Sequence, residues 1–530
     1  MASERAVKSN ALGTKLSNSD HQEQEEVIDF LSDPSAYGSG IEGVERCETH
    51  GAIVFLAGAR AYKLKRAVKL PYMDYSTVER RLTMCQAELT INSPLAPMIY
   101  LGVCPVVRSS DGTLRLGSLD ETDQAVDWLV VMNRFDQSAL FSALCDRGAL
   151  TDSLIRALAE QVALFHQKAL KTEAYGGLGG ISDVVKECET IFGNTPGLFP
   201  EGKVSNFSRF ARQALAQNGE LLEARRTNGH VGRCHGDLHL SNICLLDGIP
   251  VLFDAIEFSD DFGCIDLLYD LAFLIMDLER HGREREANIL LNRYLAKTGD
   301  YAGLPALPLF LACRAAIRAH VAATTILIAA KNAGELANQA AQLFDLSVDY
   351  LKPGSAQLVA VGGLSGTGKS TIAASLAPAI GRRPGAIVVR TDELRKELWG
   401  IPESQKLPQE AYSKEFSAKV YAALAERTSI ILKSGQSVIA DGVFGTQVER
   451  DLVRRQAEAL SLSFHGFWLE ASQPVLEKRI AGRIGDVSDA TVAVLHSQMR
   501  NVDPPNDWVR IRATGPLLQI VSKAEQILSA

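Results

Sequence analysis

The feature that most constrains the fold is a glycine-rich stretch, GGLSGTGKST, at residues 362–371. It contains Gly363-x-x-x-x-Gly368-Lys369-Ser370, the pattern of a loop whose backbone amides surround phosphate groups at the N-terminus of a helix. An apolar strand, QLVAV, precedes the loop, and a helix-like stretch, TIAASLAPAI, follows it. The pattern therefore predicts a parallel α/β domain with a nucleotide-phosphate site.

Two further apolar strands of this domain end in carboxylates. AIVVR precedes Thr391-Asp392, and SVIAD ends at Asp441. The C-terminal ends of parallel strands lie along one edge of a sheet, where ligands bind. We expect Lys369 to reach the β- and γ-phosphates, and Ser370 and Asp441 to hold Mg²⁺. The residues expected to contact the nucleotide here are Gly363, Ser365, Gly366, Thr367, Gly368, Lys369, Ser370 and Thr371.

Asp392 and Arg395 lie three positions apart at the start of a helix-like stretch, DELRKEL, so they share a face. Asp392 is positioned to accept the proton of an acceptor hydroxyl. Arg395 is positioned to bind the acceptor or the moving phosphoryl group. The alternative for Asp392 is a purely structural role as the N-cap of the helix.

A second polar cluster surrounds a predicted hairpin at residues 235–254, HGDLHLSNICLLDGIPVLFD. Two short apolar runs, ICLL and IPVLF, are joined by an Asp-Gly pair, which is a strong signal for an antiparallel hairpin. Asn242 and Asp254 flank the two runs, so we expect them to converge at one end. Amide and carboxylate oxygens suit Mg²⁺ held against substrate phosphates. Asp237 then faces a substrate hydroxyl, an arrangement found in protein kinases.

HGDLHLSN followed by FDAIEF resembles the aminoglycoside phosphotransferase and choline kinase family, a branch of the protein-kinase-like fold. The resemblance implies that Asp237 is the catalytic base, that Asn242 and Asp254 hold magnesium, and that His235 and His239 shape the loop. It covers residues of about 25–350, and its specific motifs lie mainly between 235 and 258.

The same resemblance assigns a phosphate-binding lysine to the strand AYKLKRAV, which follows an apolar strand that starts at Ala52. Lys63 and Lys65 share one face of this strand because side chains alternate with a period of two. Lys63 fits the family spacing, and Lys65 is the alternative. A glutamate on the following helix, VERRLTMCQAELTINSPL, is expected to pair with the lysine. Glu88 fits best, and Glu79 is the alternative.

The segment DWLVVMNRFD places an apolar strand before Met132 and Asn133, where the resembling family has the hinge between its lobes. The resemblance implies that backbone groups of residues 131–133 hydrogen-bond the adenine.

Charged residues on two later helices have expected roles as well. Asp266 and Asp270 lie four positions apart on a largely apolar helix, and the resemblance implies that they hydrogen-bond the catalytic loop rather than react. Arg314 and Arg318 share a helix face, where they meet a substrate anion or pair with carboxylates.

In the C-terminal part, the D-x-x-R sequence, the IADG strand and LEKRIAGRIGDVSDA resemble small P-loop kinases of the gluconate kinase and polynucleotide kinase type. That resemblance implies that Arg479 and Arg483 are lid arginines that contact the nucleotide. It also places the end of the lid at residues 486–489.

Composition restricts the partners. With 55 basic and 63 acidic residues, the net charge of −8 and the lack of a long basic run disfavour nucleic acid. The nine cysteines form no C-x-x-C pair and point to a reducing compartment. The N-terminus lacks the apolar core of a signal peptide, and no apolar run reaches the roughly 18 residues of a membrane span. We therefore expect a cytoplasmic protein that acts on small hydroxylated molecules and does not bind a membrane.

The sequence thus predicts an N-terminal bilobal protein-kinase-like α+β domain at 25–352 and a P-loop parallel-sheet α/β domain at 353–530, after a disordered tail at 1–24. The expected function is ATP- and Mg²⁺-dependent phosphorylation of small metabolites at two kinase sites. One alternative is a single N-terminal kinase site gated by an ATP-sensing P-loop domain. Another is nucleic-acid end repair, which the acidic charge disfavours.

Overall fold

The structure is a computed structural model that describes residues 18–529 except 50, 71, 119–120, 122–124, 196, 329–332 and 483–487. Packing divides the chain into two compact units. The first contains the described residues up to 191 together with 222–277 and 317–341, and the second contains 192–221, 278–316 and the residues from 342 onward.

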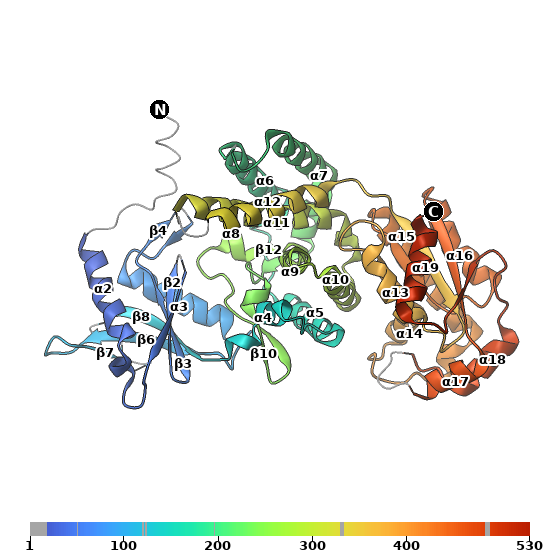
Figure 1. Ribbon diagram of the computed structural model, residues 1–530, viewed down its shortest axis with the longest axis horizontal. Coiled ribbons are helices and arrows are strands. Elements are labelled where there is room, and N and C mark those ends of the chain that lie inside the picture. Colours follow the sequence, from blue (N-terminus) through green and yellow to red (C-terminus); the bar gives the residue numbers. More distant parts are fainter. Residues whose placement is uncertain are drawn as a thin grey trace. The chain divides into compact units, whose positions relative to one another are not determined.

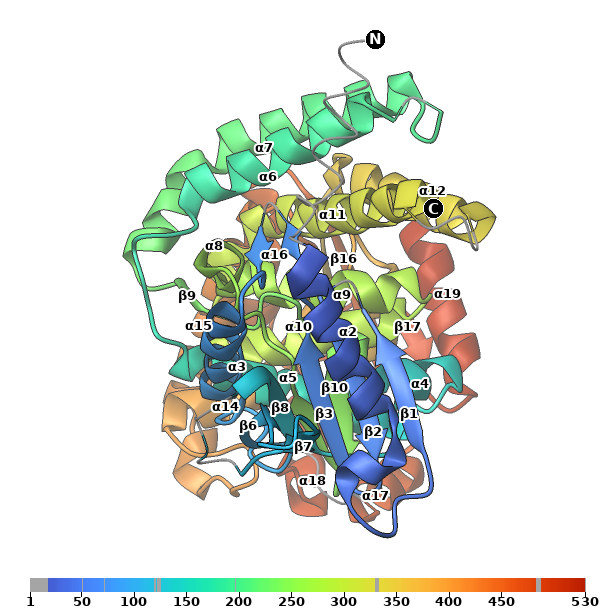
Figure 2. The ribbon, with the colours of Figure 1, turned by 90° about the vertical axis from the view of Figure 1, so that its left-hand side faces the viewer.

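An antiparallel sheet in the first unit has the strand order β1-β2-β3-β8-β6-β7. The helix α2 (Asn18–Ser32) lies along one face of it (Figure 2). Leu31 of this helix belongs to the same buried apolar cluster as Phe55 and Leu64. The helix α3 (Val78–Asn92) covers the other face with Cys85. The six strands are β1 (Val44–Glu48), β2 (Ala52–Ala57), β3 (Arg60–Lys65), β6 (Tyr100–Arg108), β7 (Leu114–Leu116) and β8 (Ala125–Asn133).

The helix α2 begins within the stretch 1–24 that the sequence predicts to be a disordered tail. Gln24 is buried, and its side-chain amide donates to Lys65 O at 3.0 Å and to Asp127 Oδ2 at 2.9 Å. Residues 1–17 lie outside the described part of the chain.

The predicted hairpin is confirmed. Strands β10 (Ile243–Leu246) and β11 (Ile249–Leu252) pair antiparallel, with Ile243 opposite Leu252. The turn places Asp247 and Gly248 at positive φ, as a two-residue Asp-Gly hairpin turn requires.

The other elements before residue 352 are mostly helices. They are β4 (Lys69–Leu70), β5 (Met73–Asp74), α4 (Phe141–Asp146), α5 (Asp152–Lys168), α6 (Gly177–Gly193), α7 (Glu201–Thr227), β9 (Val231–Arg233), α8 (Asp260–Gly263), β12 (Cys264–Asp266), α9 (Leu267–Arg280), α10 (Glu284–Thr298), α11 (Leu307–Ile328) and α12 (Ala333–Leu351), with the 3-10 turns η1 (Pro34–Tyr37), η2 (Gln137–Ala139), η3 (Leu240–Asn242) and η4 (Tyr301–Ala306). Among the described residues one helical stretch, Tyr301–Ile326, is long and apolar enough to cross a membrane, but 72% of its most apolar window is buried inside the protein.

The second unit contains the predicted parallel sheet, with the strand order β14-β15-β13-β16-β17. Figure 1 draws the helices of this part of the chain, labelled α13 to α19, in yellow to red. Helices cover its faces, and its core includes Val359, Ile372, Ile439 and Phe467. The strands are β13 (Gln357–Gly363), β14 (Ile387–Arg390), β15 (Val438–Asp441), β16 (Ser463–Glu470) and β17 (Val509–Arg512). The helices are α13 (Lys369–Leu376), α14 (Thr391–Trp399), α15 (Lys414–Lys433), α16 (Gln447–Glu458), α17 (Gln473–Ala481), α18 (Val492–Asn501) and α19 (Leu517–Ser529), with the 3-10 turns η5 (Ala377–Ala379) and η6 (Gln409–Tyr412).

The helix α10 packs against the edge strand β14 of this sheet, within the second unit. Asn292 Nδ2 donates to Ala386 O at 3.2 Å, and Val388 N donates to Asn292 Oδ1 at 2.7 Å. Asn288 Nδ2 also donates to Ala386 O, at 3.1 Å. Two asparagine side chains therefore form hydrogen bonds with backbone groups at the edge of the sheet, where a further strand could otherwise pair. The division at 352 and 353 stays a prediction, and the packing groups residues 278–316 with the P-loop fold.

Candidate active sites

Lys63, on β3, connects two carboxylates of the first unit. Its Nζ lies 2.9 Å from Glu88 Oε1 on α3 and 2.5 Å from Asp254 Oδ1 after the hairpin. Burial by itself lowers the pKa of Lys63, but the charges of Asp254 and Glu88 raise it well above its ordinary value. The lysine is therefore held in its charged form. Lys63 and Glu88 thus lie together as predicted, whereas Glu79 is exposed in the first turn of α3.

Lys65 lies on the same face of β3 and shares the Glu88 carboxylate. Its Nζ is 2.6 Å from Glu88 Oε2 and also contacts Glu257. Glu257 in turn accepts a hydrogen bond of 2.7 Å from the Tyr75 hydroxyl. Glu257 was missed by the sequence analysis, although its place three residues after Asp254 in FDAIEF carries the signal.

The predicted catalytic loop is fixed by backbone hydrogen bonds to α9. Asp270 accepts from His235 N at 3.1 Å and from Gly236 N at 2.9 Å, and Asp277 accepts from Leu240 N at 3.0 Å. Gly236 has a φ of +81°, and a Cβ there would lie 2.7 Å from Phe262 O. The structure thus gives Asp270 the loop-holding role predicted for it.

Asp266 was also predicted to hydrogen-bond the catalytic loop, but its contacts are elsewhere. Its carboxylate pairs with Arg225 at 2.7 and 2.8 Å and accepts from Leu268 N at 2.8 Å. These contacts fix the start of α9.

Asp237 presents a carboxylate at the cavity of the first unit, and its side chain is 39% exposed. Asn242 Nδ2 donates to Asp237 O and Oδ2, both at 3.0 Å, and His239 Nε2 lies 3.3 Å from Oδ2. Burial alone raises the pKa of Asp237, but the charge and hydrogen bond of His239, with the charges of His235 and Arg318, lower it below its ordinary value. The carboxylate is therefore ionised at neutral pH and able to accept a proton.

Asn242 and Asp254 lie at the same end of the hairpin but one residue out of register. Phe253 N donates to Asn242 O at 3.0 Å, so Asn242 faces Phe253, and Asp254 follows with a φ of +63°. The bonds from Asn242 to Asp237 use its amide nitrogen and leave Oδ1 for a cation. An amide oxygen and a carboxylate are hard ligands that suit Mg²⁺. Asp254 lines the cavity, whereas Asn242 is buried beside it.

Lys63, Asp237 and Asp254 line a cavity of about 600 Å³. One part of its wall is apolar and includes Leu56, Ala61, Ile99, Met132 and Phe253. An adenine ring requires such a wall.

The predicted hinge lies at this cavity, where both Met132 and Asn133 line the wall. The Asn133 amide already donates to Ile99 O at 2.7 Å, and its side chain donates to Met98 O at 2.8 Å. Adenine recognition by backbone groups of residues 131–133 stays a prediction.

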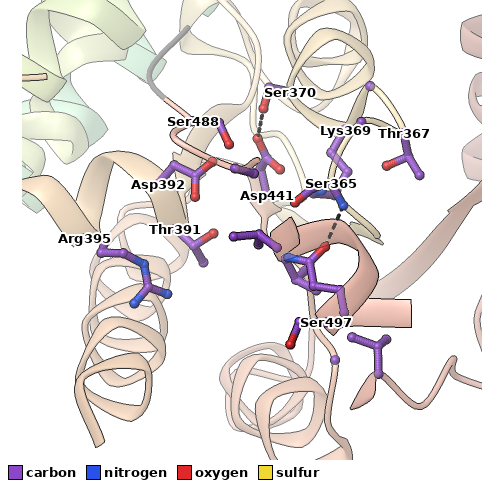
Figure 3. A pocket seen from close by; sticks show the side chains of 18 of the residues that line it. Ser365, Thr367, Lys369, Ser370, Thr391, Asp392, Arg395, Asp441, Ser488 and Ser497 are labelled. Atoms are coloured by element: carbon purple, nitrogen blue, oxygen red, sulfur yellow. Dashed lines mark hydrogen bonds between the residues drawn. The ribbon is translucent and has the colours of Figure 1, made fainter. Parts of the chain in front are cut away.

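The P-loop of the second unit connects β13 to α13, as predicted. Gly366 and Gly368 have φ values of +88° and +90°, and a Cβ on Gly366 would lie 2.9 Å from Leu476 O. Gly363 has a φ of +141°, and a Cβ there would lie 2.7 Å from Leu469 O. Lys369 Nζ donates to Leu364 O at 3.1 Å. The loop residues 365–371 line a cavity of about 1030 Å³ (Figure 3).

Ser370 and Asp441 meet in this cavity. The Ser370 hydroxyl donates to Asp441 Oδ2 at 2.6 Å, as the dashed line in Figure 3 marks. Arg390, at the end of β14, places Nη2 3.0 Å from Ser370 Oγ and Nε 3.4 Å from Asp441 Oδ2. The hydroxyl and carboxylate suit a P-loop Mg²⁺. Arg390 was missed by the sequence analysis, although it directly precedes Thr391-Asp392.

Asp392 and Arg395 on α14 line the same cavity. The helix begins at Thr391 with Arg390 as its N-cap, so the alternative reading of Asp392 as the N-cap is wrong. Arg395 is buried, and its Nη1 donates to Ala411 O at 2.6 Å and to Ser417 Oγ at 3.2 Å. Asp392 and Arg395 therefore lie on the cavity side of α14, as their spacing predicts.

Of the two arginines predicted to lie in the lid, the structure describes one. Arg479 lines the cavity, and its Nη1 donates to the carbonyls of Gly366 and Thr367 at 3.4 and 3.3 Å. Arg483 lies outside the described residues. Gln498 on α18 was not predicted, and its Oε1 accepts from Ser365 N at 2.9 Å.

The two folds and their cavities define a class: a protein-kinase-like phosphotransferase domain followed by a P-loop kinase domain. Residues 146–307 match the model of the Phosphotransferase enzyme family, and residues 358–505 match the model of a family described as AAA domain. These matches confirm the predicted tandem arrangement.

Among curated proteins, the chain is 29% identical over 488 residues to uncharacterized proteins of Mycobacterium tuberculosis and Mycobacterium bovis. The alignments cover 91% of this chain and 94% of each relative. Among solved structures, a choline/ethanolamine kinase family protein from Mesorhizobium loti is 15% identical, with 62% of this chain and 99% of that chain covered and a TM-score of 0.36. A gluconokinase from Sinorhizobium meliloti is 25% identical, with 33% and 92% covered and a TM-score of 0.25.

Proposed function

We propose that the chain is an ATP-dependent phosphotransferase that phosphorylates hydroxyl groups of small molecules at two separate sites. One observation carries the proposal: each cavity is lined by a lysine suited to phosphate and an aspartate suited to a hydroxyl proton. Lys63 and Asp237 line the first cavity, and Lys369 and Asp392 line the second. An ATP sensor needs the lysine but has no use for the second aspartate.

At the first site the ionised Asp237 accepts the proton of the acceptor hydroxyl while the acceptor oxygen bonds to the γ-phosphorus of ATP. The bond between the γ-phosphorus and the oxygen that bridges it to the β-phosphate breaks, and ADP leaves with that electron pair. The products are ADP and a phosphate monoester, and Asp237 releases its proton to solvent. Asp392 has the corresponding role at the second site.

Magnesium supports this chemistry when bound, because it neutralises charge on the β- and γ-phosphates. Asn242 and Asp254 would hold it at the first site, and Ser370 and Asp441 at the second. Lys63 and Lys369 orient the phosphates. Arg395 binds the acceptor or the transferred group, and Arg479, close to the P-loop carbonyls, supports the nucleotide.

The net charge of −8 favours small-molecule acceptors over nucleic acid, since a nucleic-acid enzyme neutralises phosphates with clustered basic residues. All nine cysteines are free thiols, which supports a cytoplasmic location.

The test is ADP release by the intact chain with a panel of sugars, sugar acids, amino alcohols and aminoglycosides. Asp237→Asn should lower turnover of one set of acceptors by roughly 10²–10⁴-fold. It should leave nucleotide binding nearly unchanged, because the lysine and metal ligands remain. Lys369→Ala should remove a different set of activities and spare the first.

Two exposed residues give matched controls. Asp111→Asn alters a surface turn, and Lys478→Ala alters the solvent side of α17, so both should behave as wild type. Near-normal turnover of every acceptor by Asp237→Asn would show that the assignment of the base is wrong.

A further inference from the structure

Arg318, on α11, reaches the catalytic-loop side of the first cavity. Its guanidinium lies 5.9 Å from the centre of the Phe273 ring, and the His239 ring contacts Phe273 edge-on at 5.5 Å. His239 in turn lies 3.3 Å from Asp237. Arg318 and Asp237 both line the cavity, and the arginine is close enough for its charge to act on the Asp237 carboxylate.

The other cations of this cavity are already paired. Lys63 and Lys65 share Glu88 and contact Asp254 and Glu257, and Arg134 lies 2.7 Å from Glu45. Arg318, by contrast, has no carboxylate within 4.0 Å among the residues that the structure describes.

The carboxylates of the cavity are committed as well. Asp254 contacts Lys63, and Glu257 contacts Lys65 and Tyr75. Asp237 contacts Asn242 and His239 and faces the acceptor hydroxyl. Beside the reacting hydroxyl, the described cavity wall therefore offers one uncommitted cation and no spare carboxylate.

We propose that Arg318 recognises the acceptor of the first site, and that this acceptor is a hydroxylated molecule with a carboxylate or phosphate group near the reacting hydroxyl. The guanidinium fork matches the two oxygens of either anion. A cationic acceptor would meet the charge of Arg318 without a carboxylate to balance it. The inference rests on the proposed function and adds a substrate class to the same site.

The experiment uses four probes with the same three-carbon diol skeleton: D-glycerate, sn-glycerol 3-phosphate, glycerol and 3-amino-1,2-propanediol. The intact chain carries Lys369→Ala, so that ATP use reports the first site. Calorimetric binding is measured with Mg·ADP present, and ADP release is measured with Mg·ATP. At least one anionic probe should bind roughly tenfold or more tightly than glycerol and the amine, and which of the two anions binds separates carboxylate from phosphate.

Arg318→Gln should remove this preference, and Arg318→Lys, which keeps the charge without the fork, should retain part of it. Arg115→Gln is the matched control, because it removes a cation from the edge strand β7, outside the cavity. It should leave the preference unchanged.

The proposal is overturned if neither anionic probe binds, if the four probes bind equally, or if the preference survives in Arg318→Gln. A loss of ATP affinity in Arg318→Gln that is equal for all acceptors would also overturn it, because Arg318 would then act on the nucleotide. Asp237→Asn distinguishes a failure of the acceptor proposal from a failure of the proposed function. It should keep anion binding but lose transfer, and transfer that persists in this variant contradicts the proposed function whatever Arg318 does.

Discussion

Glu279, at the end of α9, is a buried carboxyl with one short hydrogen bond. The Tyr350 hydroxyl donates to its Oε2 at 2.5 Å, and Arg383 Nη1 lies 3.7 Å from Oε1. Burial raises the pKa of Glu279 from its ordinary value of 4.5 to about 7. The folded chain thus keeps this proton over a pH range in which the unfolded chain has already lost it.

This difference predicts a pH-dependent stability. Between pH 4.5 and about 7 the unfolded chain binds fewer protons at Glu279, so the free energy of unfolding falls as pH rises through this range. Glu279→Gln removes the ionisation. Its free energy of unfolding should therefore exceed that of wild type by up to about 3 kcal/mol between pH 5 and pH 8. Thermal unfolding of the intact chain at several pH values measures this gain.

Glu284→Gln serves as the control, because this carboxylate lies 4.0 Å from the same Arg383 but is 46% exposed. Its effect on the unfolding temperature should vary little with pH. A difference between Glu279→Gln and wild type that stays constant with pH would contradict the argument.

Residues carried by a local motif could be predicted from the sequence, and residues brought in by packing could not. Asp237, Lys369 and Asp392 lie in short patterns whose spacing reflects their chemistry. Arg390 and Arg318 acquire their surroundings from side chains that are distant in the sequence. Arg318 could be recognised as a candidate for an anion, but whether it pairs with a carboxylate depends on the packing of α11.

The hairpin shows which structural features an Asp-Gly turn signal predicts and which it does not. An Asp-Gly turn fixes the pairing of β10 with β11, and it correctly brings Asn242 and Asp254 to one end. The left-handed backbone at Asp254 lies beyond the ladder, so the relative offset of these two residues does not follow from hairpin register.

The helix α10 makes contacts that its sequence does not predict. No local signal in the sequence of this helix shows that Asn288 and Asn292 bind the edge of a sheet almost one hundred residues away. An edge strand exposes unpaired backbone groups that proteins cover. Here the cover includes an ion pair, since Arg293 Nη1 lies 2.7 Å from Glu403 Oε2 in the loop after α14.

Removing the Asn292 amide should therefore destabilise the second unit. Asn292→Leu leaves the partly buried Val388 amide without its partner, which costs about 1–3 kcal/mol. Hydrogen exchange of the intact chain should show faster exchange at Val388 and along β14. The control Asn206→Leu changes an exposed asparagine on α7 that does not contact the sheet, and it should leave β14 protected. Unchanged exchange in Asn292→Leu would mean that the Asn292 side chain does not stabilise β14.

The tandem of two kinase-type folds could be predicted because each fold has its own local phosphate motif. The compact units could not, because residues 278–316 follow the first motif in sequence but pack with the P-loop sheet. A P-loop fragment that starts at residue 353 would lack α10 and its cover for β14. The activity of each site is therefore best measured in the intact chain.

Asp392→Ala decides whether the P-loop site is a second catalyst. ADP release by the intact variant is measured with acceptors of both sites, alongside ATP binding. If both sites are catalysts, transfer at the P-loop site is lost, ATP still binds there through Lys369, and the first site keeps its turnover. If Asp392→Ala changes nothing while Lys369→Ala silences phosphorylation at the first site, the P-loop domain is a regulator and the chain has one catalytic site.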